Sequence, residues 1–174
     1  MNTKVLVSLS LLVGIGAVLH TIVPPLLFGM KPDMLLTMMF LGIMLFPSVK
    51  NIVLLGITTG VISALTTGFP GGQIANMIDK PISAFLFFGL FLVVRKAFNS
   101  STISAAVLTA IGTVISGVIF LSAAYFIIGL PGGFVALVTG VVLPTAVVNT
   151  IVMVVVYPIV QNVLKRTKIA SEAA

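Results

Sequence analysis

Polar side chains that could bind a small charged molecule are concentrated in one stretch of this chain, residues 68–81. The stretch reads Gly-Phe-Pro-Gly-Gly-Gln-Ile-Ala-Asn-Met-Ile-Asp-Lys-Pro and lies between two long apolar runs. It holds Asp79, one of only three acidic residues, beside Lys80, and it adds the amides of Gln73 and Asn76. Because Gly and Pro interrupt helices, polar recognition can be built here in an otherwise apolar chain.

Further polar residues accompany this stretch. Lys31 and Asp33 stand in an earlier loop, and His20 and Tyr125 lie near the ends of apolar runs. Polar groups in lipid cost several kcal/mol unless they are satisfied, so these side chains should face one another or a cavity. We therefore expect a substrate-binding site drawn from the following candidates: His20, Lys31, Asp33, Gln73, Asn76, Met77, Asp79, Lys80, Tyr125 and Asn149.

The chemistry of these candidates suits a zwitterion. Lysine side chains and helix N-termini can receive a carboxylate, whereas aspartates can receive an ammonium. Methionine and aromatic side chains would supply adaptable apolar walls that suit a large aromatic or apolar side chain. The wall candidates are Phe28, Met30, Met34, Met38, Met39, Phe69, Met77, Phe85 and Phe134.

Each candidate also has a purely structural interpretation. Asp33 and Asp79 stand where an N-cap or first-turn acid would begin a helix. His20 would serve equally as a polar helix end at the lipid headgroups. Asn149 lies in the middle of an apolar run, where a hydrogen bond between helices would explain it. The methionines of residues 34–39 are typical of packing between helices.

The composition is that of an integral membrane protein. Of the 174 residues, 59% are hydrophobic and 7% are charged, and the mean hydropathy is +1.32. A soluble domain carries about a quarter of its residues charged. The net charge of +6 comes from isolated basic residues rather than a basic stripe, so we expect membrane lipid and not nucleic acid as a partner.

The chain shows no sign of enzyme chemistry. It has one histidine and no cysteine, which excludes disulfides and thiolate metal sites. No H-E-x-x-H, G-x-S-x-G or P-loop pattern is present. We expect no catalytic residues, metal or cofactor. If the protein transports a solute actively, the energy comes from an ion gradient or from a separate energy-coupling module with its own ATPase.

The apolar runs predict an all-α bundle of six transmembrane helices in one domain, residues 1–174. None of the runs alternates as a barrel strand does. We expect the second and fourth helices to be short and a basic tail to occupy residues 165–174. The segment before His20 lacks an A-x-A-like cleavage pattern and should be a retained helix. The expected helices are 4–23, 33–46, 51–67, 77–94, 102–128 and 134–164.

The distribution of Lys and Arg predicts the orientation. Cytoplasmic loops carry the excess of basic residues. Two basic residues, Lys31 and Lys80, fall on one predicted side, where each is close to an aspartate. We therefore expect both termini in the cytoplasm and the polar site toward the outside of the plasma membrane. The other side would carry Lys4, Lys50, Arg95, Lys96, Lys165, Arg166 and Lys168.

The chain contains an internal sequence repeat. Residues 68–75 match residues 129–136, with Pro-Gly-Gly at the same place in both, and the Gly-Val-Ile of residues 60–62 recurs at 117–119. A similar pairing of Met, Lys, Pro and Asp links residues 30–33 with residues 77–81. The spacing predicts a parallel duplication of a helix-loop-helix unit, although Pro-Gly-Gly alone is a common turn.

These motifs resemble a known family. Residues 31–47, 60–67, 76–81, 129–134 and 144–146 together resemble the bacterial tryptophan transport protein family (TrpP) over nearly the whole chain. The resemblance implies a multi-pass plasma-membrane protein for uptake of tryptophan. The size and helix count are more distantly similar to S components of energy-coupling-factor transporters. Their A-x-x-x-A docking pattern is replaced here by Ser10-x-x-x-Gly14, which leaves the energy source open.

We interpret the chain as a membrane protein that takes up tryptophan or a similar aromatic amino acid. Two alternatives remain at this stage. One is an S-component-like scaffold that binds another small solute, such as a vitamin, and the other is a membrane scaffold protein with no role in transport. The compensating charges around Asp33 and Asp79 favour a zwitterionic ligand over both alternatives.

Overall fold

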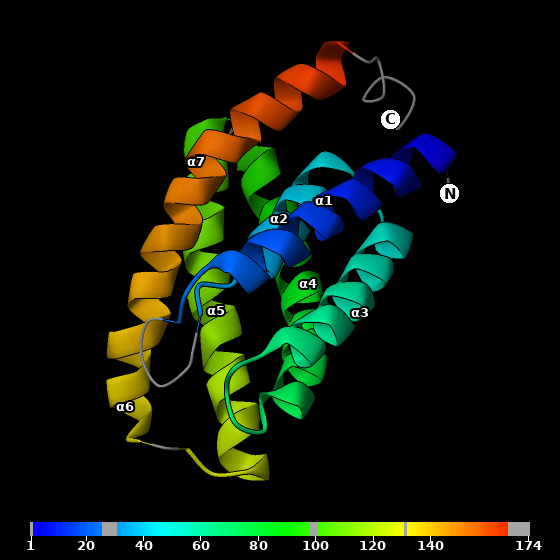
Figure 1. Cartoon of the computed structure of the whole chain (residues 1–174). Coiled ribbons are helices and arrows are strands. Elements are labelled where there is room, and N and C mark those ends of the chain that lie inside the picture. Colours follow the sequence, from blue (N-terminus) through cyan, green and yellow to red (C-terminus); the bar gives the residue numbers. More distant parts are fainter. Residues whose placement is uncertain (1, 26–30, 98–100, 131, 167–174) are drawn as a thin grey trace.

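The computed structural model describes residues 2–25, 31–97, 101–130 and 132–166. This part of the chain is entirely helical, which confirms the predicted fold class (Figure 1). Five helical segments are long and apolar enough to cross a membrane. The elements are α1 (Thr3–Ile22), α2 (Met34–Leu45), α3 (Val49–Thr66), α4 (Gly72–Ala97), α5 (Thr102–Ile127), α6 (Phe134–Leu137), the π-helical turn η1 (Val138–Val142) and α7 (Leu143–Arg166).

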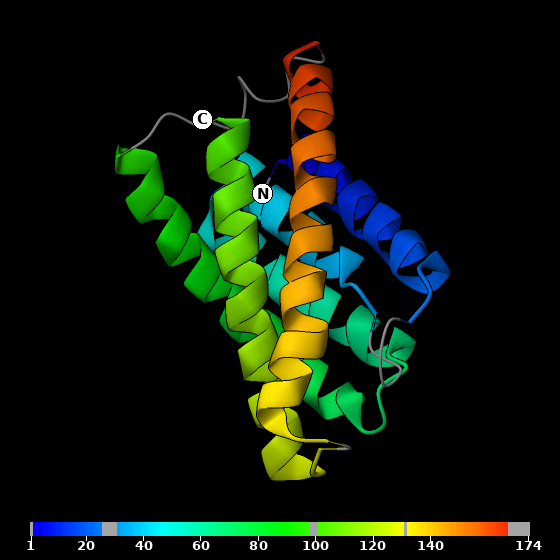
Figure 2. The same cartoon turned by 90° about the vertical axis from the view of Figure 1, so that its left-hand side faces the viewer.

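The short second helix, α2, lies inside the bundle. It has 12 residues, and every one from Met34 to Met44 is buried. A helix that is apolar all round belongs in a core, so α2 has no face that must meet lipid. It packs against α1, α3, α4, α5 and α7, which surround it in Figures 1 and 2. The ring of Phe40 stacks on Phe87 of α4, with centroids 3.9 Å apart.

The fourth helix is longer than predicted. We expected a short helix over residues 77–94, but α4 runs for 26 residues from Gly72. Gly71 adopts a φ of +70°, and the Gly72 N–H donates to the Phe69 carbonyl, so the turn is completed before Gln73. Pro81 is accommodated inside the helix rather than ending it. Asp79 therefore lies in the helix interior, and its interpretation as an N-cap is wrong.

Asp33, by contrast, caps a helix, as its structural interpretation predicted. Its Oδ1 accepts a hydrogen bond of 2.9 Å from the Leu36 N–H at the start of α2. Ser48 and Ser101 cap α3 and α5 in the same way. Each cap satisfies a helix N–H that would otherwise have no partner. The carboxylate of Asp33 is thus held at the N-terminus of the buried helix.

The loops before α4 and α6, which contain the two repeated segments, lie at the same end of the bundle in their described residues (Figure 1). Their turns differ, because the positive φ falls on Gly71 in the first segment and on Gly129 in the second. Gly60 and Gly117, however, occupy similar places. A Cβ at Gly60 would lie 3.4 Å from Lys80 Cβ, and one at Gly117 would lie 2.4 Å from Val142 Cγ1. Both glycines let neighbouring helices approach closely, and the duplication itself stays a prediction.

The last long helical segment contains the π turn η1 within residues 134–166. The Leu143 N–H donates to the carbonyl of Val138, five residues earlier. The next residue, Pro144, has no N–H, and its ring crowds the carbonyl of the preceding turn. A wider turn accommodates that ring. Single π turns in α-helices are often found at functional sites, and this one presents Val141 and Val142 to a cavity.

Gly112 of α5 provides a test of the close packing. A Cβ there would lie 2.7 Å from the Phe87 ring and 2.9 Å from the Phe40 ring. We expect Gly112→Ala to lower the free energy of unfolding by about 1–3 kcal/mol because the stacked rings must separate. Reversible unfolding of the purified protein in detergent measures this change.

Gly14→Ala is the matched control. Nothing lies within 4 Å of a Cβ added at Gly14, so the substitution should be neutral or stabilising by up to about 1 kcal/mol. Equal stability of Gly112→Ala and wild type would contradict the packing described here.

Candidate functional site

A cavity with an empty volume of about 620 Å³, including its open side, lies inside the bundle. Its walls come from α1, α2, α4, α5, η1 and α7, together with the loops before α2 and α4. The lining combines five charged or ionisable groups with hydroxyls, one amide and apolar side chains. The lining residues are His20, Lys31, Asp33, Leu36, Thr67, Gly68, Phe69, Asn76, Asp79, Lys80, Thr113, Ser116, Gly117, Phe120, Val141, Val142 and Thr145.

An ion-pair network forms the polar side of this cavity. Lys80 Nζ lies 2.7 Å from Asp33 Oδ2 and 2.5 Å from Asp79 Oδ2. Asp79 is 0% exposed and Lys80 is 2% exposed. Two carboxylates therefore share one ammonium away from water. Buried ions are stable only when they are paired and hydrogen-bonded, so each of these side chains depends on the other two.

Hydroxyl groups complete the surroundings of Asp79. Ser83 Oγ, one turn further along α4, donates to Asp79 Oδ1 at 2.6 Å. Ser116 Oγ on α5 donates to both carboxylate oxygens, at 2.9 and 2.8 Å. Charge-assisted bonds of this kind stabilise the ionised carboxylate. The network thus joins α2, α4 and α5.

His20 reaches the same network from the end of α1. It is buried, and its Nδ1 lies 3.7 Å from Asp33 Oδ1. This Nδ1 has no hydrogen-bond partner in the described part of the chain. The structure therefore places the His20 side chain at the cavity, buried among the helices rather than on the outside of the bundle.

The cavity also has an aromatic wall. Phe69 belongs to the loop before α4 yet is buried, and its ring packs edge to face on Phe120 of α5 with centroids 5.5 Å apart. Of the other predicted wall residues, Met34, Met38 and Met39 are buried in the core, in accordance with the packing alternative. Phe85 and Phe134 are exposed on the outside of the bundle, and Phe28 and Met30 lie outside the described residues.

Six of the ten candidate residues line the cavity together: His20, Lys31, Asp33, Asn76, Asp79 and Lys80. Their positions on α4 follow the helical repeat. Asn76, Asp79, Lys80 and Ser83 are spaced three and four residues apart, which places them on one face. The Asn76 amide also donates to the Gly72 carbonyl at 2.9 Å.

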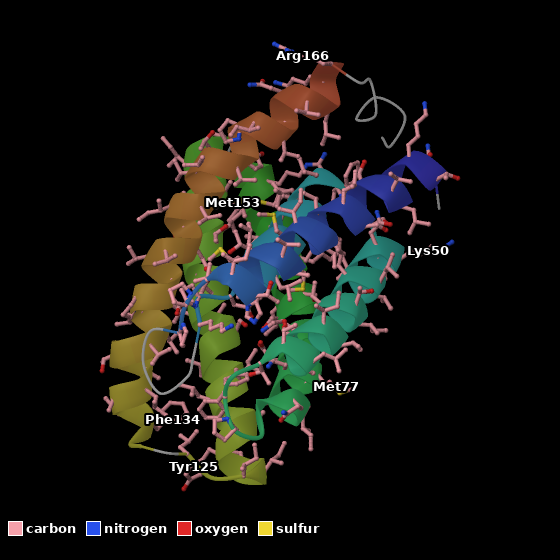
Figure 3. The ribbon with its side chains drawn as sticks, in the orientation of Figure 1. Lys50, Met77, Tyr125, Phe134, Met153 and Arg166 are labelled. Carbon is pink, nitrogen blue, oxygen red and sulfur yellow. The ribbon has the colours of Figure 1, made fainter. Side chains whose placement is uncertain are left out.

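Three candidates point away from the cavity. Met77 is 54% exposed and Tyr125 is 57% exposed, and Figure 3 shows both near the same end of the bundle. Gln73 is also exposed. We expected Gln73 and Met77 to lie in or next to the loop before the fourth helix. Both instead belong to α4, four residues apart on the face opposite Asp79. Tyr125 lies in the last turn of α5, on its outer side.

Asn149 lies next to the cavity rather than on its wall. It is 0% exposed, and its Nδ2 donates to Thr113 Oγ1 over 3.4 Å. This bond between α7 and α5 matches the interhelical alternative for Asn149.

Sequence reasoning missed the contribution of α5 and α7. Thr113, Ser116 and Phe120 follow one another at intervals of three and four residues on the cavity face of α5, and Thr145 faces them from α7. Ser and Thr are common in apolar helices, where they often bond to their own main chain. Their periodic spacing, together with Phe120, was the signal that could have identified this face.

The comparisons with known proteins agree on one family. The family model described as "Tryptophan transporter TrpP" matches residues 2–165. A Bacillus subtilis protein named "Probable tryptophan transport protein" is 61% identical over 99% of both chains. Proteins of the same name from Clostridium acetobutylicum and Clostridium perfringens are 39% and 37% identical, each over at least 95% of both chains. No solved structure matches the chain, so the likeness to S components stays a prediction.

The ion-pair network predicts the consequence of removing its one cation. Lys80→Met would leave the fully buried Asp79 beside the partly buried Asp33 without the ammonium that both carboxylates contact. We expect the free energy of unfolding to fall by about 3–5 kcal/mol. Chemical denaturation in detergent, without ligand, measures the loss.

Lys50→Met is the control because Lys50 is exposed at the start of α3. It should change stability by less than about 0.5 kcal/mol. A Lys80→Met protein as stable as Lys50→Met would show that the network contributes nothing to the fold.

Proposed function

The chain belongs to the TrpP family of tryptophan transporters, and on this premise we propose that the cavity is the tryptophan site through which the protein takes up its substrate across the plasma membrane. The family is described as one of tryptophan transporters, and we propose that the chain has no enzyme activity. The observation that carries the proposal is the cavity itself, in which a buried set of opposite charges adjoins an aromatic wall. A free amino acid with an aromatic side chain has both features.

The charged side of the cavity would bind the backbone groups of the amino acid. Asp79 and Asp33 are acceptors for the ammonium, and Lys80 and Lys31 are donors for the carboxylate. A zwitterion brings no net charge into the network. Its ammonium can replace one contact of Lys80, and its carboxylate can then receive the Lys80 ammonium. The exchange keeps every buried ion paired, which is the condition for stability in a low dielectric.

The aromatic side of the cavity would bind the indole. Phe69 and Phe120 offer ring faces and edges, and Leu36, Val141 and Val142 add apolar surface. Aromatic pairs in offset or edge-to-face contact gain about 0.5–1.5 kcal/mol beyond their buried area. The indole N–H needs an acceptor when it is buried, and Asn76 Oδ1 is the amide oxygen of the lining.

We propose that both termini lie in the cytoplasm. The N-terminus and the end of α7 lie at the same end of the bundle (Figure 1), where Figure 3 shows Arg166. The last turn of α4 also carries Arg95 and Lys96. The positive-inside rule assigns such an end to the cytoplasm. Lys168 and most of the expected basic tail lie outside the described residues.

The source of energy for uptake is an ion gradient or a separate energy-coupling module. The chain has no nucleotide-binding motif. Ser10 and Gly14 are exposed on the outer face of α1, and a Cβ at Gly14 would meet nothing within 4 Å. This face is therefore open to a second membrane protein, which is the one observation that favours a module.

The orientation can be tested by cysteine labelling because the chain has no cysteine of its own. In intact cells an impermeant thiol reagent should label Gln73→Cys, at the end that holds the Pro-Gly-Gly loops. It should leave Lys50→Cys, at the start of α3, unlabelled until the cells are opened. The reverse pattern would overturn the orientation.

Asp79→Asn tests the role of the buried carboxylate in binding. The substitution preserves size but removes a charge-assisted bond to the ammonium, worth about 1.5–3 kcal/mol. We expect tryptophan to bind at least about tenfold more weakly to purified Asp79→Asn than to wild type. Equilibrium binding of labelled tryptophan measures this.

Two controls accompany this measurement. Indole-3-propionate lacks the ammonium and should show little difference between the two proteins. Tyr125→Phe, on the outside of the bundle, should bind tryptophan as wild type does. Equal tryptophan affinity in Asp79→Asn and wild type would return Asp79 to a structural role.

A further inference from the structure

Unpartnered oxygen atoms are grouped where α5 meets α7, next to the proposed tryptophan site. Among the described residues, Thr109 Oγ1, Thr145 Oγ1 and Asn149 Oδ1 are buried without a hydrogen-bond partner. Buried polar atoms are almost always satisfied by protein, water or a bound ion. Thr145 Oγ1 and Asn149 Oδ1, one turn apart on α7, therefore call for an occupant.

Helices α5 and α7 run antiparallel (Figure 1), so the contact of Asn149 with Thr113 has Thr145 one turn away on one side and Thr109 one turn away on the other. Thr145 and Asn149 are four residues apart and lie on one face of α7, and Thr109 and Thr113 do the same on α5. The hydrogen bond from Asn149 Nδ2 to Thr113 Oγ1 faces the two pairs toward each other. Thr113 and Thr145 also line the cavity. Helices α5 and α7 run side by side over this part of the bundle (Figure 2).

These hydroxyls differ from other threonine hydroxyls of the chain. Thr59, Thr66 and Thr150 each donate to the carbonyl four residues earlier in their own helix, at 2.6 to 2.7 Å. That bond is the usual way for a helical threonine to satisfy itself in an apolar environment. Thr109 and Thr145 make no such bond, so their oxygens are free to serve something other than the helix.

The nearest charged group favours a cation as the occupant. Asp79 is bonded to Ser116, which lies one turn from Thr113 on the same face of α5. Asp33 and Asp79 balance Lys80 and the partly buried Lys31 in the cavity lining, so the cavity charges as a whole sum to zero. Hydroxyl and amide oxygens are hard, neutral ligands. With no carboxylate among them, they suit a monovalent ion better than Ca²⁺ or Mg²⁺, which take carboxylate ligands.

We propose that Thr113, Thr145 and Asn149 form a binding site for Na⁺ beside the substrate cavity. Water from the cavity would complete the coordination. A Na⁺ ion there adds a positive charge at the wall of the cavity, where it would attract the carboxylate of the substrate. The coupling to tryptophan rests on the proposed function, whereas the ion site itself rests on the oxygens alone.

The ion site is tested without tryptophan. The unfolding temperature of the purified protein is measured in NaCl and in choline chloride at equal ionic strength. A ligand that binds only the folded protein raises its stability in proportion to the logarithm of its concentration above the dissociation constant. We expect Na⁺ to raise the unfolding temperature of wild type above its value in choline, with a smaller effect of K⁺.

Thr145→Val removes one ligand oxygen with little change in shape. It should require at least about tenfold more Na⁺ for the same rise in unfolding temperature. Thr145→Ser keeps the hydroxyl and should respond as wild type does. Thr150→Val is the matched control on the same helix, because its hydroxyl is already bonded to the Ala146 carbonyl; its response to Na⁺ should be unchanged.

An equal unfolding temperature of wild type in Na⁺ and choline would overturn the ion site and leave the oxygens to water. A Na⁺ response that is the same in Thr145→Val and wild type would also overturn it. Tryptophan binding is measured separately in both salts. Binding that is tighter in Na⁺ supports the coupling, by the reciprocity of linked sites. Absence of tryptophan binding in both salts would overturn the proposed function, while the unfolding temperatures still decide the ion site.

Discussion

The fold depends on one buried ammonium that is shared by two carboxylates. Lys80 of α4 contacts Asp79 on its own helix and Asp33 at the N-terminus of α2. Asp79 extends the contact to α5 through Ser116, and Asp33 extends it toward His20 of α1. Since a buried ion without a partner is far more costly than a broken surface pair, these four helices cannot separate without exposing or unpairing a charge.

The remaining architecture follows from keeping this network inside a thin, apolar bundle. The short helix α2 is buried all round and carries Asp33 to the middle of the protein. Glycines at positions 56 and 60 bring α3 close to α4 near Pro81 and Lys80. On the opposite side, Gly117 admits Val142 of the π turn. The space that remains between these contacts is the cavity.

Different walls of the cavity would bind different parts of the substrate and the ion. The charged residues of α2 and α4 suit the two ends of an amino acid, and Phe69 with Phe120 suits its indole ring. The oxygens between α5 and α7 form a third surface, where we propose Na⁺. The zwitterion would replace one ion-pair contact of the network next to the site for the cation. Substrate and ion would then stabilise each other's binding. This coupling would need no nucleotide chemistry in this chain.

The sequence by itself determined the class of the protein and most of the charged site. Composition and the length of the apolar runs identified a helical membrane bundle, because a chain with so few charges cannot cover a surface in water. The same scarcity singled out His20, Lys31, Asp33, Asn76, Asp79 and Lys80, since each polar group in lipid needs a partner. The resemblance around residues 31–47 and 76–81 identified the family.

Only the tertiary structure decided which way each side chain faces and what it contacts. The sequence around Gly71 and Pro81 predicted a break, but α4 runs through it, because the turn is completed before Gln73 and the proline fits within the helix. That difference of a few residues turned Gln73 and Met77 outward and moved Asp79 from a cap to the interior. Thr113, Ser116 and Thr145 were missed because hydroxyls in apolar helices usually satisfy their own main chain. Whether they do so depends on the helix that packs against them, and local sequence does not encode that neighbour.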